Sequence, residues 1–200
     1  NHPDTPIPLA SLLSHTSGIE DSSAYFRSFQ NPVTVDEILA DGACFSVRKP
    51  FEQFRYSNFA AGLVGCLLEK RFGESLEALA QRELFGPLGA TATFDLASLA
   101  AAPLANDYRV LPASRAPAFD AKTRVRTAEP LTAADPQTHF LLGSGGLFLT
   151  AEALARLALT LMNGGRVNGE TFLSAEALAQ MKTPTTDWPE PAVRMRHGMG

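Results

Sequence analysis

Tyr56 and Asn58 have the residue types and the spacing for proton transfer and for substrate binding. They directly precede a stretch from Phe59 to Leu68 that contains no charged residue. Such a stretch predicts a buried helix, with a phenol and a carboxamide at its amino end, near the positive end of the helix dipole. A free tyrosine has a pKa of about 10, so it can act as a base near neutral pH only where positive charge stabilises the phenolate. The alternative is structural, because tyrosines pack in cores and asparagines cap helices.

The elements that must position this pair are predicted to be helices. The central helix is expected to run to Phe72 and to end at Gly73, and its small residues would let other backbones approach closely. These are Ala60, Ala61, Gly62 and Gly65. A short helix is expected to begin at Pro8 and to stop at Thr16-Ser17-Gly18, and further helices should begin at the capping residues Thr34, Ser75, Thr150 and Ser174.

Five prolines between residues 103 and 136 forbid a long helix there and predict an irregular segment with at most a weak hairpin. No internal repeat, low-complexity tract or domain boundary is visible along the 200 residues. The chain is therefore expected to form one mainly α domain or subdomain over residues 1–200, with a few short strands.

Composition excludes several classes of function. The net charge is −4 and the basic residues are scattered, which argues against nucleic acid as a partner. No apolar run is long enough for a membrane span. The four histidines have no metal-ligand spacing, so no metal and no cofactor are predicted, and His15 is expected to hydrogen-bond the turn at Thr16–Gly18.

Cys44 and Cys66 leave two interpretations open. Cys66 falls on the predicted buried helix, where a thiol packs as a small apolar group, and a disulfide between the two is the alternative in an oxidising compartment. Gly143-Ser144-Gly145-Gly146 lacks the lysine of a phosphate-binding loop, and close backbone packing is the favoured role for it.

Four stretches, taken in order, resemble the penicillin-recognising serine hydrolases, the family of class C β-lactamases, DD-peptidases and related esterases. They are Leu12–Ile19, Tyr56-Ser57-Asn58, Phe85–Gly89 with Thr91 and Thr93, and Gly145-Gly146-Leu147 with Thr150. The resemblance extends from about Leu9 to Gly200 and is weakest between residues 103 and 136. It implies the helical subdomain of a serine β-lactamase/transpeptidase-like fold. Two departures are Phe51 after Pro50, where the family has glycine, and Ala90 in place of methionine.

The resemblance also implies a reaction and a site. Members of the family hydrolyse an amide, an ester or a β-lactam through an acyl-enzyme, so the partner expected here is a small-molecule or peptide substrate. Tyr56 matches the tyrosine that acts with a lysine as the proton-transfer base. Asn58 matches the asparagine that contacts that lysine and the substrate's amide or carbonyl. Relatives are often periplasmic or secreted, and nothing in the sequence decides the compartment or the oligomeric state.

The family's Ser-x-x-Lys and Lys/His-x-Gly motifs are expected to lie before and after these 200 residues, so the chain alone should be inactive. Residues Ser46 to Lys49 match Ser-x-x-Lys literally, but Pro50 biases Lys49 away from helical geometry and indicates a chance match. Two alternatives stay open: a complete esterase with Ser46 as nucleophile, and a non-catalytic domain of this architecture used for binding or assembly.

Overall fold

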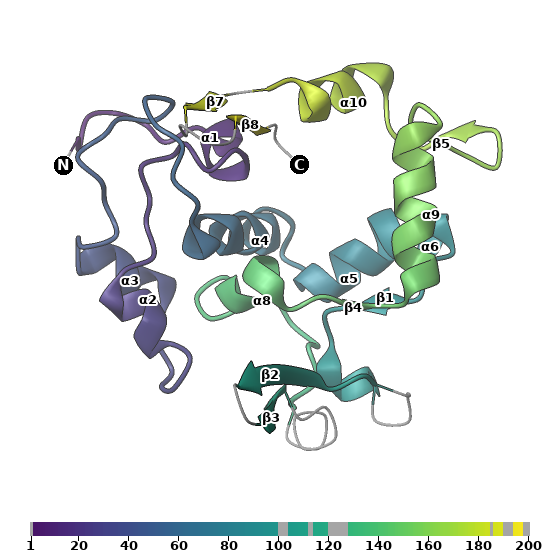
Figure 1. Cartoon of the computed structure of the whole chain (residues 1–200), viewed down its shortest axis with the longest axis horizontal. Coiled ribbons are helices and arrows are strands. Elements are labelled where there is room, and N and C mark those ends of the chain that lie inside the picture. The colour runs from purple at the N-terminus through teal and green to yellow at the C-terminus, as the bar shows by residue number, and fades with distance from the viewer. Residues whose placement is uncertain are drawn as a thin grey trace.

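Short helices surround one long central helix, α4, in the computed structural model (Figure 1). The structure describes residues 2–99, 104–111, 114–119, 128–184, 186–189 and 194–197. The α-helices are α1 (Leu9–Leu13), α2 (Ser23–Arg27), α3 (Val35–Ala40), α4 (Asn58–Phe72), α5 (Leu76–Ala80), α6 (Gly86–Leu88), α8 (Phe140–Gly145), α9 (Ala151–Met162) and α10 (Ala175–Lys182). A π-helical turn, η1 (Gln81–Phe85), joins α5 to α6, and a 3-10 turn, η2 (Leu96–Leu99), follows the first strand.

The strands among the described residues are short and form antiparallel pairs instead of one sheet. They are β1 (Ala92–Thr93) with β4 (Phe148–Leu149), β2 (Asp107–Leu111) with β3 (Ser114–Phe119), β5 (Arg166–Val167) with β6 (Glu170–Thr171), and β7 (Thr186–Pro189) with β8 (Arg194–His197). The predicted mainly helical fold with few short strands is confirmed. The β2–β3 hairpin falls in the proline-containing segment, of which residues 103, 112–113 and 120–127 lie outside the described part, as do residues 198–200 after His197.

Helix starts and ends follow the predicted caps. The predicted caps Thr34, Ser75, Thr150 and Ser174 each accept a hydrogen bond from the backbone N–H three residues further on. In α4 the cap is Ser57, which accepts from the N–H of Ala60, and not Asn58, which the sequence analysis considered for this role. The α4 helix ends at Gly73, which has a left-handed φ of 71° that costs glycine no steric clash. Local capping chemistry therefore places the amino end of α4 directly after Tyr56.

Helix α8 crosses α4 at very short range. A Cβ atom added to Gly62 would lie 2.1 Å from the carbonyl oxygen of Phe140, and one added to Gly143 would lie 3.1 Å from that of Ala61. No side chain fits at either position without a shift of backbone. The predicted role of these glycines in close backbone packing is confirmed.

Three aromatic rings fill the core beside this crossing. Phe59 and Phe140 meet edge to face, with ring centroids 5.6 Å apart, and Tyr25 on α2 lies 5.9 Å from Phe59 and 6.2 Å from Phe140. All three side chains are buried, so edge-to-face contacts add to the free energy of burying large apolar area. The cluster joins α2, α4 and α8.

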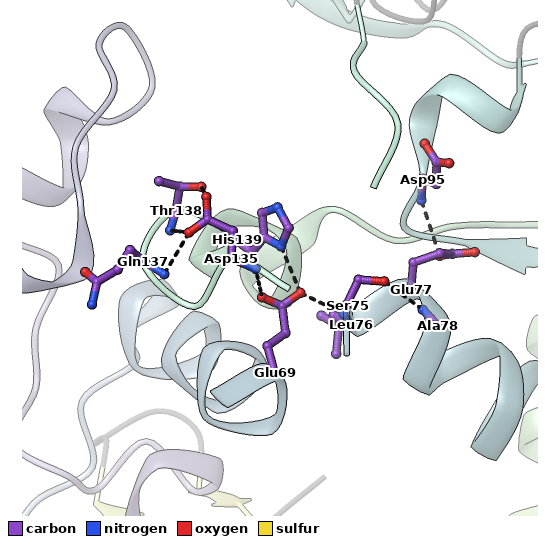
Figure 2. A network of polar contacts seen from close by, with 10 residues as sticks. All are labelled: Glu69, Ser75, Leu76, Glu77, Ala78, Asp95, Asp135, Gln137, Thr138 and His139. Carbon is purple, nitrogen blue, oxygen red and sulfur yellow. Dashed lines mark hydrogen bonds and ion pairs between the residues drawn. The ribbon is translucent and has the colours of Figure 1, made fainter. Parts of the chain in front are cut away.

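Glu69, in the last turns of α4, is a fully buried carboxylate, and Figure 2 shows the groups that it contacts. Its Oε1 accepts a hydrogen bond from the N–H of Leu76 at 2.7 Å and another from Nδ1 of His139 at 2.8 Å. Its Oε2 accepts from the N–H of Asp135 at 2.9 Å. Leu76 is the first residue of α5, where the helix dipole favours negative charge. One side chain thus connects α4 to the start of α5 and to the segment before α8.

That segment is itself folded around the carboxylate of Asp135. It accepts hydrogen bonds from the hydroxyl of Thr138 at 2.6 Å and from the backbone N–H groups of Gln137 and Thr138 at 3.1 Å (Figure 2). These bonds, that of the Thr138 hydroxyl above all, hold the pKa of Asp135 below its ordinary value. The loop is fixed in position before α8 begins.

Both cysteines are free, buried thiols. Burial raises the pKa of Cys66 to about 12 and also raises that of Cys44, whose Sγ donates to the carbonyl of Ile38 at 3.5 Å. In this fold they act as packing residues.

Candidate active site

The structure brings the two predicted site residues into contact at the amino end of α4. The hydroxyl of Tyr56 donates a hydrogen bond to Oδ1 of Asn58 at 3.2 Å. Between them, Ser57 has extended backbone and caps the helix. Tyr56 is 59% exposed, so more than half of the residue's surface is open to solvent.

His15 contacts Tyr56 on one side. The two rings are tilted by 39° with centroids 4.4 Å apart, and Nδ1 of His15 accepts a hydrogen bond from the N–H of Ser57 at 3.3 Å. The backbone of His15 has a φ of 54°, uncommon for a residue other than glycine. Sequence reasoning assigned His15 to the turn at Thr16–Gly18 and missed its contact with the candidate base.

Asp21 contacts Asn58 on the other side. Its Oδ2 accepts from Nδ2 of Asn58 at 2.7 Å and from the N–H of Asn58 at 3.2 Å, while its Oδ1 accepts from the hydroxyl of Ser57 and the N–H of Phe59, both at 2.9 Å. The sequence analysis did not predict this residue, which lies 36 positions before Ser57. Its place just after the stretch Leu12–Ile19 is the signal that would have drawn attention to it.

An apolar cavity of about 710 Å³ adjoins Asn58. The exposed rings of Phe26 and Phe29 form part of its wall, together with Leu147 and Phe148 beyond α8. None of the described lining residues is charged. The cavity suits a neutral, apolar group of a substrate whose polar part reaches Asn58.

Ser46 is not part of this arrangement. It lines a different cavity, of about 370 Å³, with His2 and Arg48, and residues 46–49 form no helix, as Pro50 predicts. Nor do the described residues contain a cluster of three His, Cys, Asp or Glu side chains that could hold a metal ion. A search of the described helices finds none long and apolar enough to cross a membrane.

The fold is shared with solved serine-hydrolase-fold proteins. A penicillin-binding protein homologue from Pyrococcus abyssi, described as octameric, has a TM-score of 0.66 and 24% identity over 92% of this chain and 40% of its own. The LovD6 mutant of simvastatin synthase from Aspergillus terreus has a TM-score of 0.62 and 24% identity, over 94% of this chain and 43% of its own. A D-stereospecific amidohydrolase from a Streptomyces species has a TM-score of 0.64 and 20% identity, over 96% of this chain and 55% of its own.

The family model described as Beta-lactamase matches residues 1–200, and the chain therefore belongs to this family. The resemblance predicted from the sequence motifs is confirmed. The chain spans only about 40% to 55% of the length of these three solved structures. No curated protein matches the sequence closely enough to add to this assignment.

Proposed function

We propose that this chain is the helical part of a serine hydrolase that forms and hydrolyses an acyl-enzyme, with Tyr56 as the proton-transfer base. The observation that carries the proposal is the contact between the Tyr56 hydroxyl and Asn58 Oδ1 at the amino end of α4, beside an apolar cavity. Membership of the β-lactamase family supports it, since Tyr56 and Asn58 match the family's Tyr-x-Asn motif.

In this proposal the nucleophilic serine and its lysine come from sequence outside these 200 residues. With Tyr56 as a phenolate, the serine oxygen bonds to the substrate carbonyl carbon while its proton passes to the phenolate oxygen, which gives a tetrahedral intermediate. Tyr56 then gives the proton to the nitrogen or oxygen of the leaving group as the bond from that atom to the carbonyl carbon breaks, which leaves the acyl-serine. In the second half of the cycle, water bonds to the acyl carbon and loses a proton to Tyr56. Tyr56 returns this proton to the serine oxygen as the bond between that oxygen and the acyl carbon breaks, which releases the acid and regenerates the serine.

Asn58 has a separate task at each stage. In the structure, Oδ1 of Asn58 accepts a hydrogen bond from the hydroxyl of Tyr56. Once Tyr56 has lost this proton, the same oxygen needs another hydrogen-bond donor. A lysine ammonium beside Asn58 Oδ1 would supply that donor and would also stabilise the phenolate. Arg55 is less suited to this role, because its Nε pairs with Glu20 at 3.1 Å.

The cavity favours substrates with a neutral, apolar acyl group. Phe26 and Phe29 are 53% and 60% exposed although they are aromatic, and they face the same cavity as Asn58. An apolar acyl chain placed against them would bury this surface, at roughly 25 cal/mol per Å² of apolar area. Ester, amide and β-lactam bonds all remain within the proposed range.

The test is labelling with a fluorophosphonate, read by intact mass, on the 200-residue chain and on the full-length protein that contains it. We expect one adduct per molecule of the full-length protein, outside residues 1–200, and none on the 200-residue chain. An adduct on Ser46, removed by Ser46→Ala, would instead favour a complete esterase within this chain. A folded full-length protein without any adduct would favour the non-catalytic binding or assembly domain.

A further inference from the structure

We infer that Asp21 is a positioning residue that sets the orientation of the Asn58 carboxamide and, through it, holds the hydroxyl of Tyr56. The inference rests on the proposed function for its consequence in catalysis. It concerns a residue whose side chain hydrogen-bonds Ser57, Asn58 and Phe59. Its basis is the set of four hydrogen bonds that the Asp21 carboxylate accepts at the start of α4.

The first step is the direction of the Asn58 amide. An ionised carboxylate can only accept hydrogen bonds, whereas an asparagine side chain has one accepting and one donating end. Nδ2 of Asn58 lies 2.7 Å from Oδ2 of Asp21, the shortest of the four contacts. A reversed amide would place two oxygen acceptors against each other at this distance. Asp21 therefore forces Oδ1 of Asn58 to face the opposite way.

The second step is the position of Tyr56. Its hydroxyl donates to the Oδ1 that Asp21 has oriented, at 3.2 Å. Because the ring of Tyr56 is largely exposed, few packing contacts fix it beyond the tilted contact with His15. The hydrogen bond to Asn58 thus determines where the phenol oxygen stands. With the amide reversed, the donor Nδ2 would meet the hydroxyl, and the same site could no longer accept from a neutral phenol or from an ammonium.

The third step separates this role from simple helix capping. Ser57 already caps α4 through its hydroxyl, which accepts from the N–H of Ala60 at 3.0 Å. Asp21 adds acceptors for the N–H groups of Asn58 and Phe59, which the helix leaves without an internal partner. A cap needs only these backbone contacts. The contact with Nδ2 of Asn58 is additional and bears on the orientation of a proposed catalytic side chain.

The experiment compares kcat and KM for hydrolysis of a p-nitrophenyl ester by the full-length protein and its variants, each normalised to the number of active sites titrated by the burst. Asp21→Asn is isosteric and keeps an oxygen for Ser57 and Phe59, but it offers a donor to Asn58 in place of an acceptor. We expect kcat to fall about 10–100-fold, the scale of a misplaced catalytic group, with KM changed less than about threefold.

A double-mutant cycle tests directly whether Asp21 acts through Asn58. If Asp21 acts through Asn58, Asp21→Asn should cause no further loss of kcat in an Asn58→Ala background. Thr34→Ala, which removes the cap of the remote helix α3, controls for lost helix stability and should leave kcat per active site unchanged. Should Asp21→Asn yield no folded protein, Asp21→Glu, which keeps the acceptor but moves it, replaces it in the same cycle.

A wild-type kcat in the Asp21 variant would overturn the inference, as would losses in kcat that multiply independently with Asn58→Ala. A change confined to the number of titrated sites would also overturn it, because it would show a structural role alone. An inactive wild-type protein that gives no burst would instead contradict the proposed function. The two failures are therefore distinguishable.

Discussion

Replacing Glu69 by alanine should destabilise the fold more than any other single loss of a charged side chain among the described residues. The side chain is 0% exposed and accepts three hydrogen bonds, from Leu76, Asp135 and His139 (Figure 2). Each buried donor left without a partner costs about 1–3 kcal/mol. Because water can enter a site vacated by a carboxylate, we expect a total toward the lower end of the sum for three donors, about 3–5 kcal/mol.

The assay is thermal and urea unfolding of the full-length protein. For a cooperative unit of 150–250 residues, 3–5 kcal/mol corresponds to a fall in Tm of roughly 6–20 °C, and the fall is smaller where a larger unit unfolds together. Glu69→Gln keeps one oxygen for two of the donors and should lose about 1–3 kcal/mol. The control is Glu152→Ala, which breaks an exposed i,i+4 pair with Arg156 and should cost less than about 0.5 kcal/mol. Equal effects of Glu69→Ala and Glu152→Ala would refute the argument that the buried carboxylate holds α4, α5 and the segment before α8 together.

Three further predictions concern packing and titration. Gly62→Ala should lower the free energy of unfolding in urea by about 3 kcal/mol or more, because the added Cβ would lie 2.1 Å from the carbonyl oxygen of Phe140. An unchanged free energy of unfolding would show that α4 and α8 are packed less closely than described. Cys66, with a pKa of about 12, should react with a thiol reagent at pH 8 about 10³-fold more slowly in the native protein than in urea, and rapid native labelling would contradict its burial. The lowered pKa of Asp135 stabilises the fold above about pH 4, and this contribution is lost as the pH falls through the folded-state value. Asp135→Asn should therefore show a smaller decrease in Tm between about pH 5 and pH 3 than the wild type, and an unchanged decrease would count against this assignment.

Capping residues and glycines made the helices predictable from sequence. Thr34, Ser75, Thr150 and Ser174 start helices because each satisfies a backbone N–H that is three residues away in the chain. Gly73 ends α4 for an equally local reason. The placement of Tyr56 and Asn58 at one helix end was predictable in the same way, whereas the hydrogen bond between them was not predicted.

Contacts between segments that are distant in the chain could not be predicted from the sequence. Asp21, His15 and His139 reach their partners across 36, 42 and 70 residues, and no periodicity encodes such pairings. The burial of Glu69 was not predicted. The sequence of its helix contains no charged residue from Phe59 to Leu68, and a charged residue after such a stretch, near a helix end, is ordinarily exposed. Burial of that carboxylate depends on donors from two other parts of the chain.

The central claim, that Tyr56 is the proton-transfer base of an acyl-enzyme mechanism, is tested most directly by the single-turnover acylation rate of Tyr56→Phe. The full-length protein is mixed with an activated ester, and the acylated fraction is followed by rapid-quench intact mass. Loss of general base catalysis predicts a fall of about 10²–10⁴-fold in the acylation rate, with Tm within a few degrees of the wild type because the ring is exposed. An acylation rate equal to that of the wild type would contradict the account.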